Sequence, residues 1–118
     1  QIWEKYDDAL RDWAARNGVR QPFIPQDRGQ AYHMYYLLFP ALAQRQAFIA
    51  RLKEQEILSV FHYLPLHLSD MGLRYGGKAG DCPITERISD QLVRLPFFYN
   101  LTDAEQDRVI ETVISQPV

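Results

Sequence analysis

Two histidines and a tyrosine are grouped around a proline in the middle of the chain, within residues 61–67. Imidazole and phenol side chains can transfer protons or form hydrogen bonds to a ligand. His62 and Tyr63 end an apolar, strand-like run, and Pro65 then redirects the chain, so we expect the pair at the exit of a strand. His62, Tyr63 and His67 are therefore the candidate site residues. The alternative is that His62 is a hydrogen-bonded core histidine and Tyr63 a packing aromatic residue.

Other sequence patterns that often carry chemistry do not fit their usual roles here. The two histidines are five residues apart across a proline, unlike the His-x-x-x-His pair of a helical metal site, so we expect no metal. The glycine-rich residues 75–80 lack the Gly-Lys-Ser/Thr ending of a phosphate-binding loop and predict a surface loop. The single cysteine, Cys82, has no basic neighbour in the sequence and predicts a small buried apolar group.

The composition is that of one globular domain. The 118 residues carry 13 basic and 15 acidic side chains, so no basic surface for nucleic acid is expected. One cysteine fits a reducing compartment, and we expect a cytoplasmic protein. We expect no membrane span, because no apolar run approaches the ~18 residues that a spanning helix needs, and no leader sequence opens the chain.

The pattern along the chain predicts an α+β domain. Apolar spacing predicts a helix over residues 2–17, stopped by Asn17-Gly18; it starts without a capping residue and is expected to continue upstream. A linker over residues 19–30 is followed by a strand (32–39), a helix (41–55) and a strand (57–63), which form a β-α-β unit. Next come a glycine-containing loop, a helix (85–94), a short strand (95–98) and a final helix from Asp103, begun by a Thr102/Glu105 capping box. We expect two layers, with helices on one small sheet of about three strands.

Three segments carry a resemblance to a known family. They are Phe-His-Tyr-Leu-Pro-Leu-His at residues 61–67, Arg-Leu-Pro-Phe-Phe-Tyr-Asn-Leu at residues 94–101, and the closing segment from Thr102-Asp103 to Val109-Ile110. Together these strings resemble the C-terminal domain of the DegT-type nucleotide-sugar aminotransferases. The resemblance covers nearly the whole chain.

This resemblance implies the small C-terminal domain of a fold type I, pyridoxal-phosphate-dependent enzyme that works as a homodimer. Such an enzyme moves an amino group from glutamate to a dTDP-4-keto-6-deoxyhexose in cell-surface polysaccharide or deoxyaminosugar biosynthesis. Residues 1–118 would form that domain, with residues 1–17 as the end of an interdomain helix and residues 31–118 as the α+β body. By this resemblance, the large domain that binds pyridoxal phosphate and carries the Schiff-base lysine would lie outside residues 1–118. Lys5, Lys53 and Lys78 do not stand in the context of that lysine, so no catalytic residue is assigned, and we expect the chain alone to be inactive.

By the same resemblance, His62, Tyr63 and His67 would bind the sugar hydroxyls or the diphosphate and orient the substrate. Arg94 could face a carboxylate of the amino donor, although an arginine that ends a helix is also favourable for the helix dipole. A rival function from another class is a non-catalytic interaction module, whose aromatic edge, residues 32–36, binds a partner chain.

Overall fold

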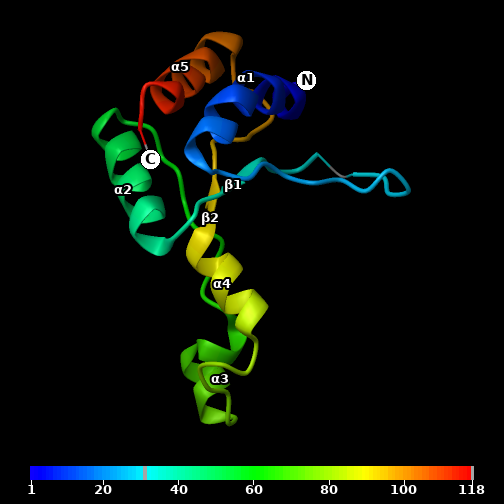
Figure 1. Ribbon diagram of the computed structural model, residues 1–118, viewed down its shortest axis with the longest axis vertical. Helices are drawn as coiled ribbons and strands as arrows, with labels where there is room; N and C mark the ends of the chain where they lie inside the picture. Colours follow the sequence, from blue (N-terminus) through cyan, green and yellow to red (C-terminus); the bar gives the residue numbers. More distant parts are fainter. Residues whose placement is uncertain (31, 118) are drawn as a thin grey trace.

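The computed structural model of the chain describes residues 1–30 and 32–117. Its body consists of the longer helices and a small sheet, from which a loop projects sideways and a helical extension projects downward (Figure 1). The elements in chain order are α1 (Ile2–Asn17), β1 (Tyr36–Leu38), α2 (Leu42–Glu54), the 3-10 helix η1 (Leu66–Leu68), α3 (Asp70–Arg74), α4 (Pro83–Gln91), β2 (Leu92–Arg94) and α5 (Asp103–Ile114).

Helix α1 confirms the prediction from apolar spacing. Its buried residues are Tyr6, Leu10, Trp13 and Ala14, and it packs beside α5. It ends at Gly18, whose φ of 67° is left-handed and whose N–H donates to the carbonyl of Ala14. Whether α1 belongs to an interdomain helix stays a prediction.

The sheet is smaller than predicted. β1 and β2 pair antiparallel, with Tyr36 opposite Arg94, and isolated bridges add Arg20 beside Leu38 and Val60 beside Arg94. Of the predicted strand at residues 57–63, only Val60 pairs with another segment, through one bridge. The predicted strand at residues 95–98 is wrong, because β2 occupies residues 92–94 instead. Pro96 has no N–H to donate, so the ladder ends there. The β-α-β prediction fails as well, since the partner of β1 comes after α4.

The helices follow the apolar pattern more closely. α2 agrees with the prediction within a residue at each end, and Thr102 Oγ1 accepts the N–H of Glu105 at 3.1 Å, as a capping residue of α5 should. α4 starts at Pro83 and ends three residues earlier than predicted, because Leu92 to Arg94 pair with β1. The predicted glycine loop contains α3 and follows η1.

Aromatic rings fill the core between α1, α2 and the sheet. Tyr35 is fully buried and lies 5.3 Å from Tyr6 and 5.5 Å from Trp3, between ring centroids. The ring centroids of Phe39 and Phe48 lie 4.6 Å apart. Because Tyr35 is part of this core, residues 32–36 are not the continuous exposed aromatic edge that the rival function assumed.

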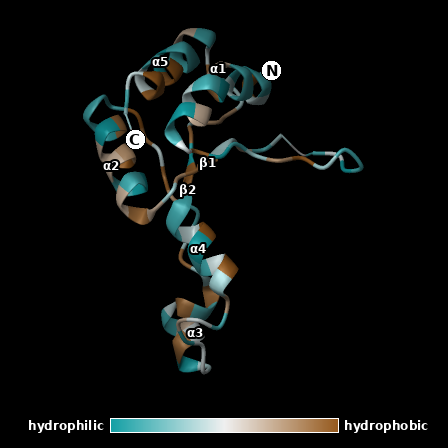
Figure 2. Ribbon diagram, viewed as in Figure 1, coloured by the Kyte–Doolittle hydropathy of each residue, from teal (hydrophilic) through white to brown (hydrophobic). Residues whose placement is uncertain are grey.

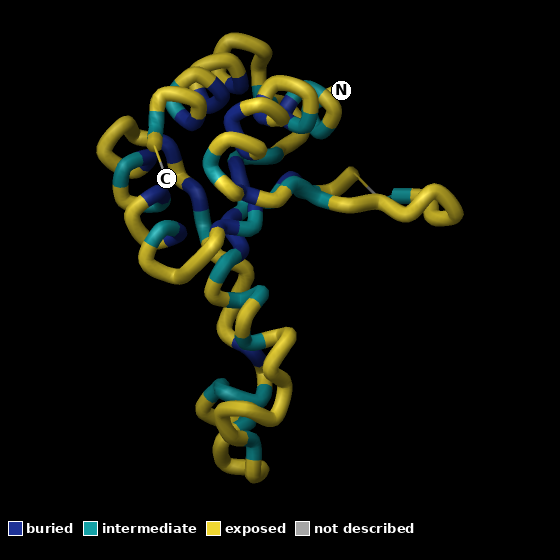
Figure 3. The backbone as a smooth tube through the Cα atoms, in the orientation of Figure 1, coloured by how far each residue is buried: buried dark blue, intermediate teal, exposed yellow. Residues whose placement is uncertain are grey.

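The two projections are mostly exposed. Figure 3 shows the arm formed by residues 21–30 and 32–34, and the extension that carries α3 and α4, as mainly exposed chain. Figure 2 shows that α4 and the chain beneath it nevertheless carry hydrophobic residues. The exposed apolar side chains of this extension include Leu66, Met71, Leu73 and Ile84.

Candidate functional site

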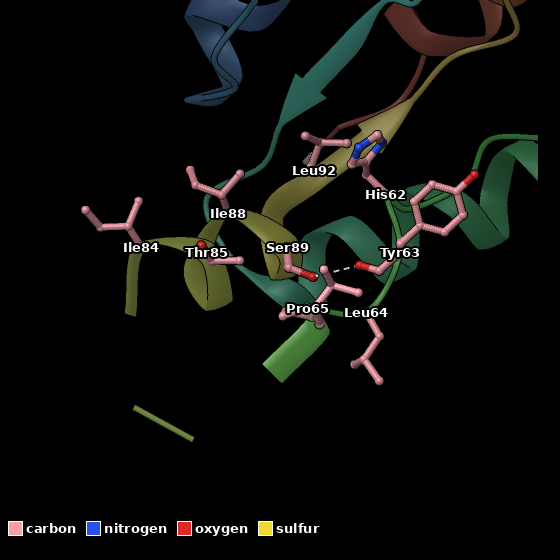
Figure 4. A pocket seen from close by; sticks show the side chains of 10 residues that line it. His62, Tyr63, Leu64, Pro65, Ile84, Thr85, Ile88, Ser89 and Leu92 are labelled. Carbon is pink, nitrogen blue, oxygen red and sulfur yellow. Dashed lines mark hydrogen bonds between the residues drawn. The ribbon is translucent and has the colours of Figure 1, made fainter. Parts of the chain in front are cut away.

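His62 and Tyr63 lie on an extended segment that follows the bridge between Val60 and Arg94. Both side chains are exposed, Tyr63 to 68%. Tyr63 has a left-handed φ of 60°, which is unusual for a residue with a bulky side chain. The hydroxyl of Ser89 on α4 donates to the Tyr63 carbonyl at 3.2 Å and helps to hold this conformation (Figure 4).

These two residues border an open groove of about 630 Å³ between their own segment and α4. Figure 4 shows Ile84 and Ile88 on the side of α4, Leu92 at the start of β2, and Pro65 on the other side. The groove is mainly apolar, and its polar side chains come from the following residues: His62, Tyr63, Thr85 and Ser89. An apolar cleft with a few polar groups is typical of ligand sites.

The ring of Tyr63 lies near two other polar side chains. The imidazole of His62 is 5.3 Å away between centroids, and the guanidinium carbon of Arg94 lies 5.3 Å from the Tyr63 ring centroid. Arg94 is in β2, so the interpretation that it ends a helix and interacts with its dipole is wrong. The structure brings Arg94 to the same place as His62 and Tyr63.

His67 does not join this group. Its side chain is 15% exposed, does not line the groove, and its Nε2 lies 3.6 Å from Oε2 of Glu86. The Glu86 carboxylate also accepts the Gly80 N–H, at 2.9 and 3.1 Å to its two oxygens. His67 thus contacts a carboxylate in the first turn of α4, and its role in substrate binding stays a prediction.

Arg45 is a residue of this region that the sequence reasoning missed. It is 6% exposed, its guanidinium donates to the Ser89 carbonyl and lies 5.4 Å from the Phe61 ring, and burial lowers its pKa. It thereby links α2 to α4 and to the segment before His62. The sequence did contain a signal for its burial, because Arg45 lies on the same i, i+3, i+7 face of α2 as the apolar residues Phe48 and Leu52.

The lysines do not fit the role of holding pyridoxal phosphate. A Schiff-base lysine must lose its proton, but a hydrogen bond and ion pair with Asp107, 2.7 Å away, and the charge of Asp103 raise the pKa of Lys5. Lys53 and Lys78 are exposed. That none of these lysines holds pyridoxal phosphate stays a prediction.

Two further expectations concern metals and Cys82. Among residues 1–30 and 32–117, no three His, Cys, Asp or Glu side chains are close enough together to hold a metal ion. Cys82 is exposed next to α4, so the expectation that it is buried is wrong. No helix in the described part of the chain is long and apolar enough to cross a membrane.

Comparisons with known proteins give one consistent result. The sequence model of the DegT/DnrJ/EryC1/StrS aminotransferase family matches residues 1–114. The chain is 28% identical over 114 residues to the dTDP-3-amino-3,4,6-trideoxy-alpha-D-glucose transaminase of Micromonospora megalomicea, with 95% of the chain and 30% of that protein covered. It is 30% identical over 98 residues to the dTDP-3-amino-3,6-dideoxy-alpha-D-galactopyranose transaminase of Aneurinibacillus thermoaerophilus, covering 80% and 26% respectively.

Solved structures show the same relation. The aminotransferase TlmJ of Streptoalloteichus hindustanus superposes with a TM-score of 0.81 at 30% identity, over 97% of this chain and 29% of that one. The chain thus spans less than a third of the length of each of these relatives.

Proposed function

The chain belongs to the DegT/DnrJ/EryC1/StrS aminotransferase family, and from this membership we propose that it is the C-terminal small domain of a sugar aminotransferase that uses pyridoxal phosphate. The complete enzyme would act as a cytoplasmic homodimer, with its large domain supplying the Schiff-base lysine and most of the cofactor site. The cofactor, when bound, supplies the electron sink for amino transfer. The chain alone would be inactive, and transamination by residues 1–118 alone would refute this part of the proposal.

The substrates that we propose are glutamate and a dTDP-4-keto-6-deoxyhexose, as for a dTDP-4-amino-4,6-dideoxygalactose transaminase. The amino group leaves glutamate, which becomes a keto acid, and replaces the keto oxygen of the sugar. The two relatives named above carry 3-amino sugars in their names, so a 3-keto sugar is the alternative acceptor. An assay that offers both keto sugars to the complete enzyme, and identifies the product, distinguishes the two.

The observation that carries the proposal is the left-handed backbone of Tyr63. A non-glycine residue in this conformation costs on the order of 1–3 kcal/mol, and such outliers cluster at functional sites. Here the conformation is held by Ser89 and presents an exposed tyrosine beside His62 at the groove. We propose that His62 and Tyr63 hydrogen-bond the sugar hydroxyls or the diphosphate, as the family motif implied.

The test is Tyr63→Phe in the complete aminotransferase. The substitution keeps the ring over Arg94 and removes one hydroxyl, so the free energy of unfolding should change by less than about 0.5 kcal/mol. Turnover of the nucleotide sugar, as kcat/KM, should fall about fivefold to tenfold, which corresponds to one lost hydrogen bond of about 1 kcal/mol.

The matched control is Tyr75→Phe, because Tyr75 is 85% exposed and does not line the groove. It should alter neither quantity. Unchanged kcat/KM for Tyr63→Phe, or a stability loss as large as the activity loss, would favour the packing interpretation of Tyr63.

A further inference from the structure

A second hollow, of about 350 Å³, lies between the end of α2, the segment after β2 and α5. It shares no lining residue with the groove beside α4. Leu58 and Phe98 line this hollow and are 73% and 47% exposed. Its apolar lining residues are Ile57, Leu58, Pro96, Phe98, Leu101 and Val109. Exposed apolar side chains gathered around a hollow are typical of a surface that another segment covers.

Three charged side chains complete the lining of this hollow. Glu56, Glu105 and Arg108 are all exposed, and two carboxylates with one guanidinium leave one net negative charge. The guanidinium of Arg108 already donates to the Gln55 carbonyl, at 2.6 Å. Neither carboxylate forms an ion pair with residues 1–30 or 32–117. The hollow therefore offers apolar walls together with two carboxylates that could pair with a cation.

Glu56 reaches this place at a cost to the local structure. It follows the end of α2 and has a left-handed φ of 60°. Its N–H donates to the Lys53 carbonyl and the Ile57 N–H donates to the Leu52 carbonyl, both at 2.9 Å, in the pattern of a helix end that usually contains glycine. A carboxylate at this end of a helix also opposes the helix dipole. Residues that break such local rules are expected at functional sites.

We propose that this hollow receives a lysine or arginine side chain from the part of the aminotransferase that lies outside residues 1–118, an inference that rests on the proposed function. Such a side chain has an apolar stem that can pack on the walls and a cationic head that can pair with Glu56 or Glu105. This chain covers only 30% and 26% of the two transaminases named above. A complete enzyme of that length has ample chain to supply the contact.

The first experiment measures the accessibility of position 58, because Leu58 lies exposed in the hollow. Leu58→Cys is combined with Cys82→Ser, which removes the exposed native thiol, in residues 1–118 and in the complete aminotransferase. Labelling by the neutral reagent iodoacetamide is followed by mass spectrometry of the peptide that contains residue 58. Labelling should be at least tenfold slower in the complete enzyme. Equal rates would overturn the proposal.

The same assay distinguishes a second copy of this chain from the proposed occupant. Labelling of residues 1–118 should stay fast as their concentration rises. If it slows to the rate of the complete enzyme, a second copy covers the hollow and the proposal fails. A complete enzyme that does not transaminate would refute the proposed function, whereas slow labelling of position 58 in that enzyme would still support the contact.

Charge variants test the cation. In the complete enzyme that carries Leu58→Cys, Glu56→Gln should speed labelling of position 58 at least threefold, because it removes one of the two carboxylates. Glu54→Gln is the matched control, since Glu54 is exposed at the end of α2 and does not line the hollow. It should leave the rate unchanged. Equal rates in the two variants would refute pairing with a cation.

Glu56→Gly separates the contact from the stability of the fold. In residues 1–118 it should raise the urea midpoint, because glycine adopts a left-handed φ without strain and the charge that opposes the dipole of α2 is removed. In the complete enzyme, the same substitution should speed labelling of position 58 as much as Glu56→Gln does. A lower midpoint, or unchanged labelling, would show that Glu56 acts only within the fold and would overturn the proposal.

Discussion

Arg45 and Arg94 are two arginines that contact neighbouring rings of one chain segment, Phe61 and Tyr63 respectively, but their surroundings give them different roles. Arg45 is almost fully buried, and its N–H groups reach the Ser89 carbonyl, near the end of α4 where helix carbonyls lack partners. Arg94 has no such acceptor among the described residues. The first arginine therefore links α2 to α4, whereas the second contacts the Tyr63 ring.

Replacing Arg45 with alanine should lower the free energy of unfolding by about 2–3 kcal/mol. The loss combines a hydrogen bond from a charged donor with the contact to the Phe61 ring. Urea unfolding followed by circular dichroism measures it. Arg87→Ala, an exposed arginine on α4, serves as the control and should stay within about 0.5 kcal/mol. If the two variants were equally stable, Arg45 would not link α2 to α4.

At the scale of elements, α3 is held against η1 by glycines that allow backbones to touch. A Cβ atom on Gly72 would overlap the Leu66 carbonyl oxygen, and one on Gly77 would overlap the carbonyl oxygen of His67. These contacts involve backbone atoms that a side-chain rotation cannot move away. The conformation of the whole turn, including the His67–Glu86 pair, depends on them.

Gly72→Ala should therefore disrupt this turn, at a local cost of more than about 2 kcal/mol. Amide hydrogen exchange should show lost protection in α3, while α1 and α5 stay protected, because these helices lie in the body (Figure 1). Gly29→Ala is the control, since Gly29 has open space around the added Cβ and no left-handed φ; it should leave exchange unchanged. Full protection of α3 in Gly72→Ala would contradict the packing described here.

Two buried tyrosines, one of them on α1, make the free energy of unfolding depend on pH in the alkaline range. Burial raises the pKa of Tyr6, whose hydroxyl donates to the Pro96 carbonyl at 2.7 Å. Burial also raises the pKa of Tyr35, with the Asp7 carboxylate acting in the same direction. Above about pH 10 the unfolded chain loses protons that the folded chain keeps. The free energy of unfolding should thus be constant with respect to these groups below pH 10 and fall as pH rises above it.

Urea unfolding at pH 9, 10 and 11 measures this decline. Tyr6→Phe should reduce its slope, because one of the two buried phenols no longer contributes. Tyr75→Phe removes an exposed phenol and should leave the slope as it is. An unchanged slope in Tyr6→Phe would mean that Tyr6 ionises as readily in the folded chain as in the unfolded chain.

At the scale of the whole molecule, the extension below the body carries exposed apolar side chains. Leu66 is 86% exposed and Ile84 67%, and both border the groove beside α4. Contiguous apolar surface of this kind is typical of an interface. The missing part of the aminotransferase would cover it under the proposed function, whereas a free-standing module would have a mainly polar surface there.

We expect residues 1–118 to bind a hydrophobic dye and to self-associate as concentration increases. The double variant Leu66→Ser with Ile84→Ser should lower dye binding by more than half, and Phe23→Ser, on the arm, should lower it much less. Dye fluorescence and sedimentation velocity measure the two effects. A monomer without dye binding would favour the interaction module over the lost interface.

How far the sequence predicted the fold depends on the type of element. The spacing of Tyr6, Leu10 and Trp13 predicted α1, and Thr102 predicted the start of α5, because helix signals are local. The strands were shifted or lost, because pairing depends on which distant segment supplies the partner. Residues 57–63 have strand-forming side chains, but only Val60 meets β2.

The sequence by itself determined the longer helices α1, α2 and α5 and the motif that carries His62 and Tyr63, since both are encoded in neighbouring residues. Tertiary structure alone decided that His67 turns to Glu86 and that Arg94 lies under Tyr63. Residues 63 and 94 are far apart in the chain, and they meet because β2 pairs with the segment at Val60. The reason is physical: hydrogen bonding between distant backbones sets which side chains share a site, and no local pattern encodes that pairing.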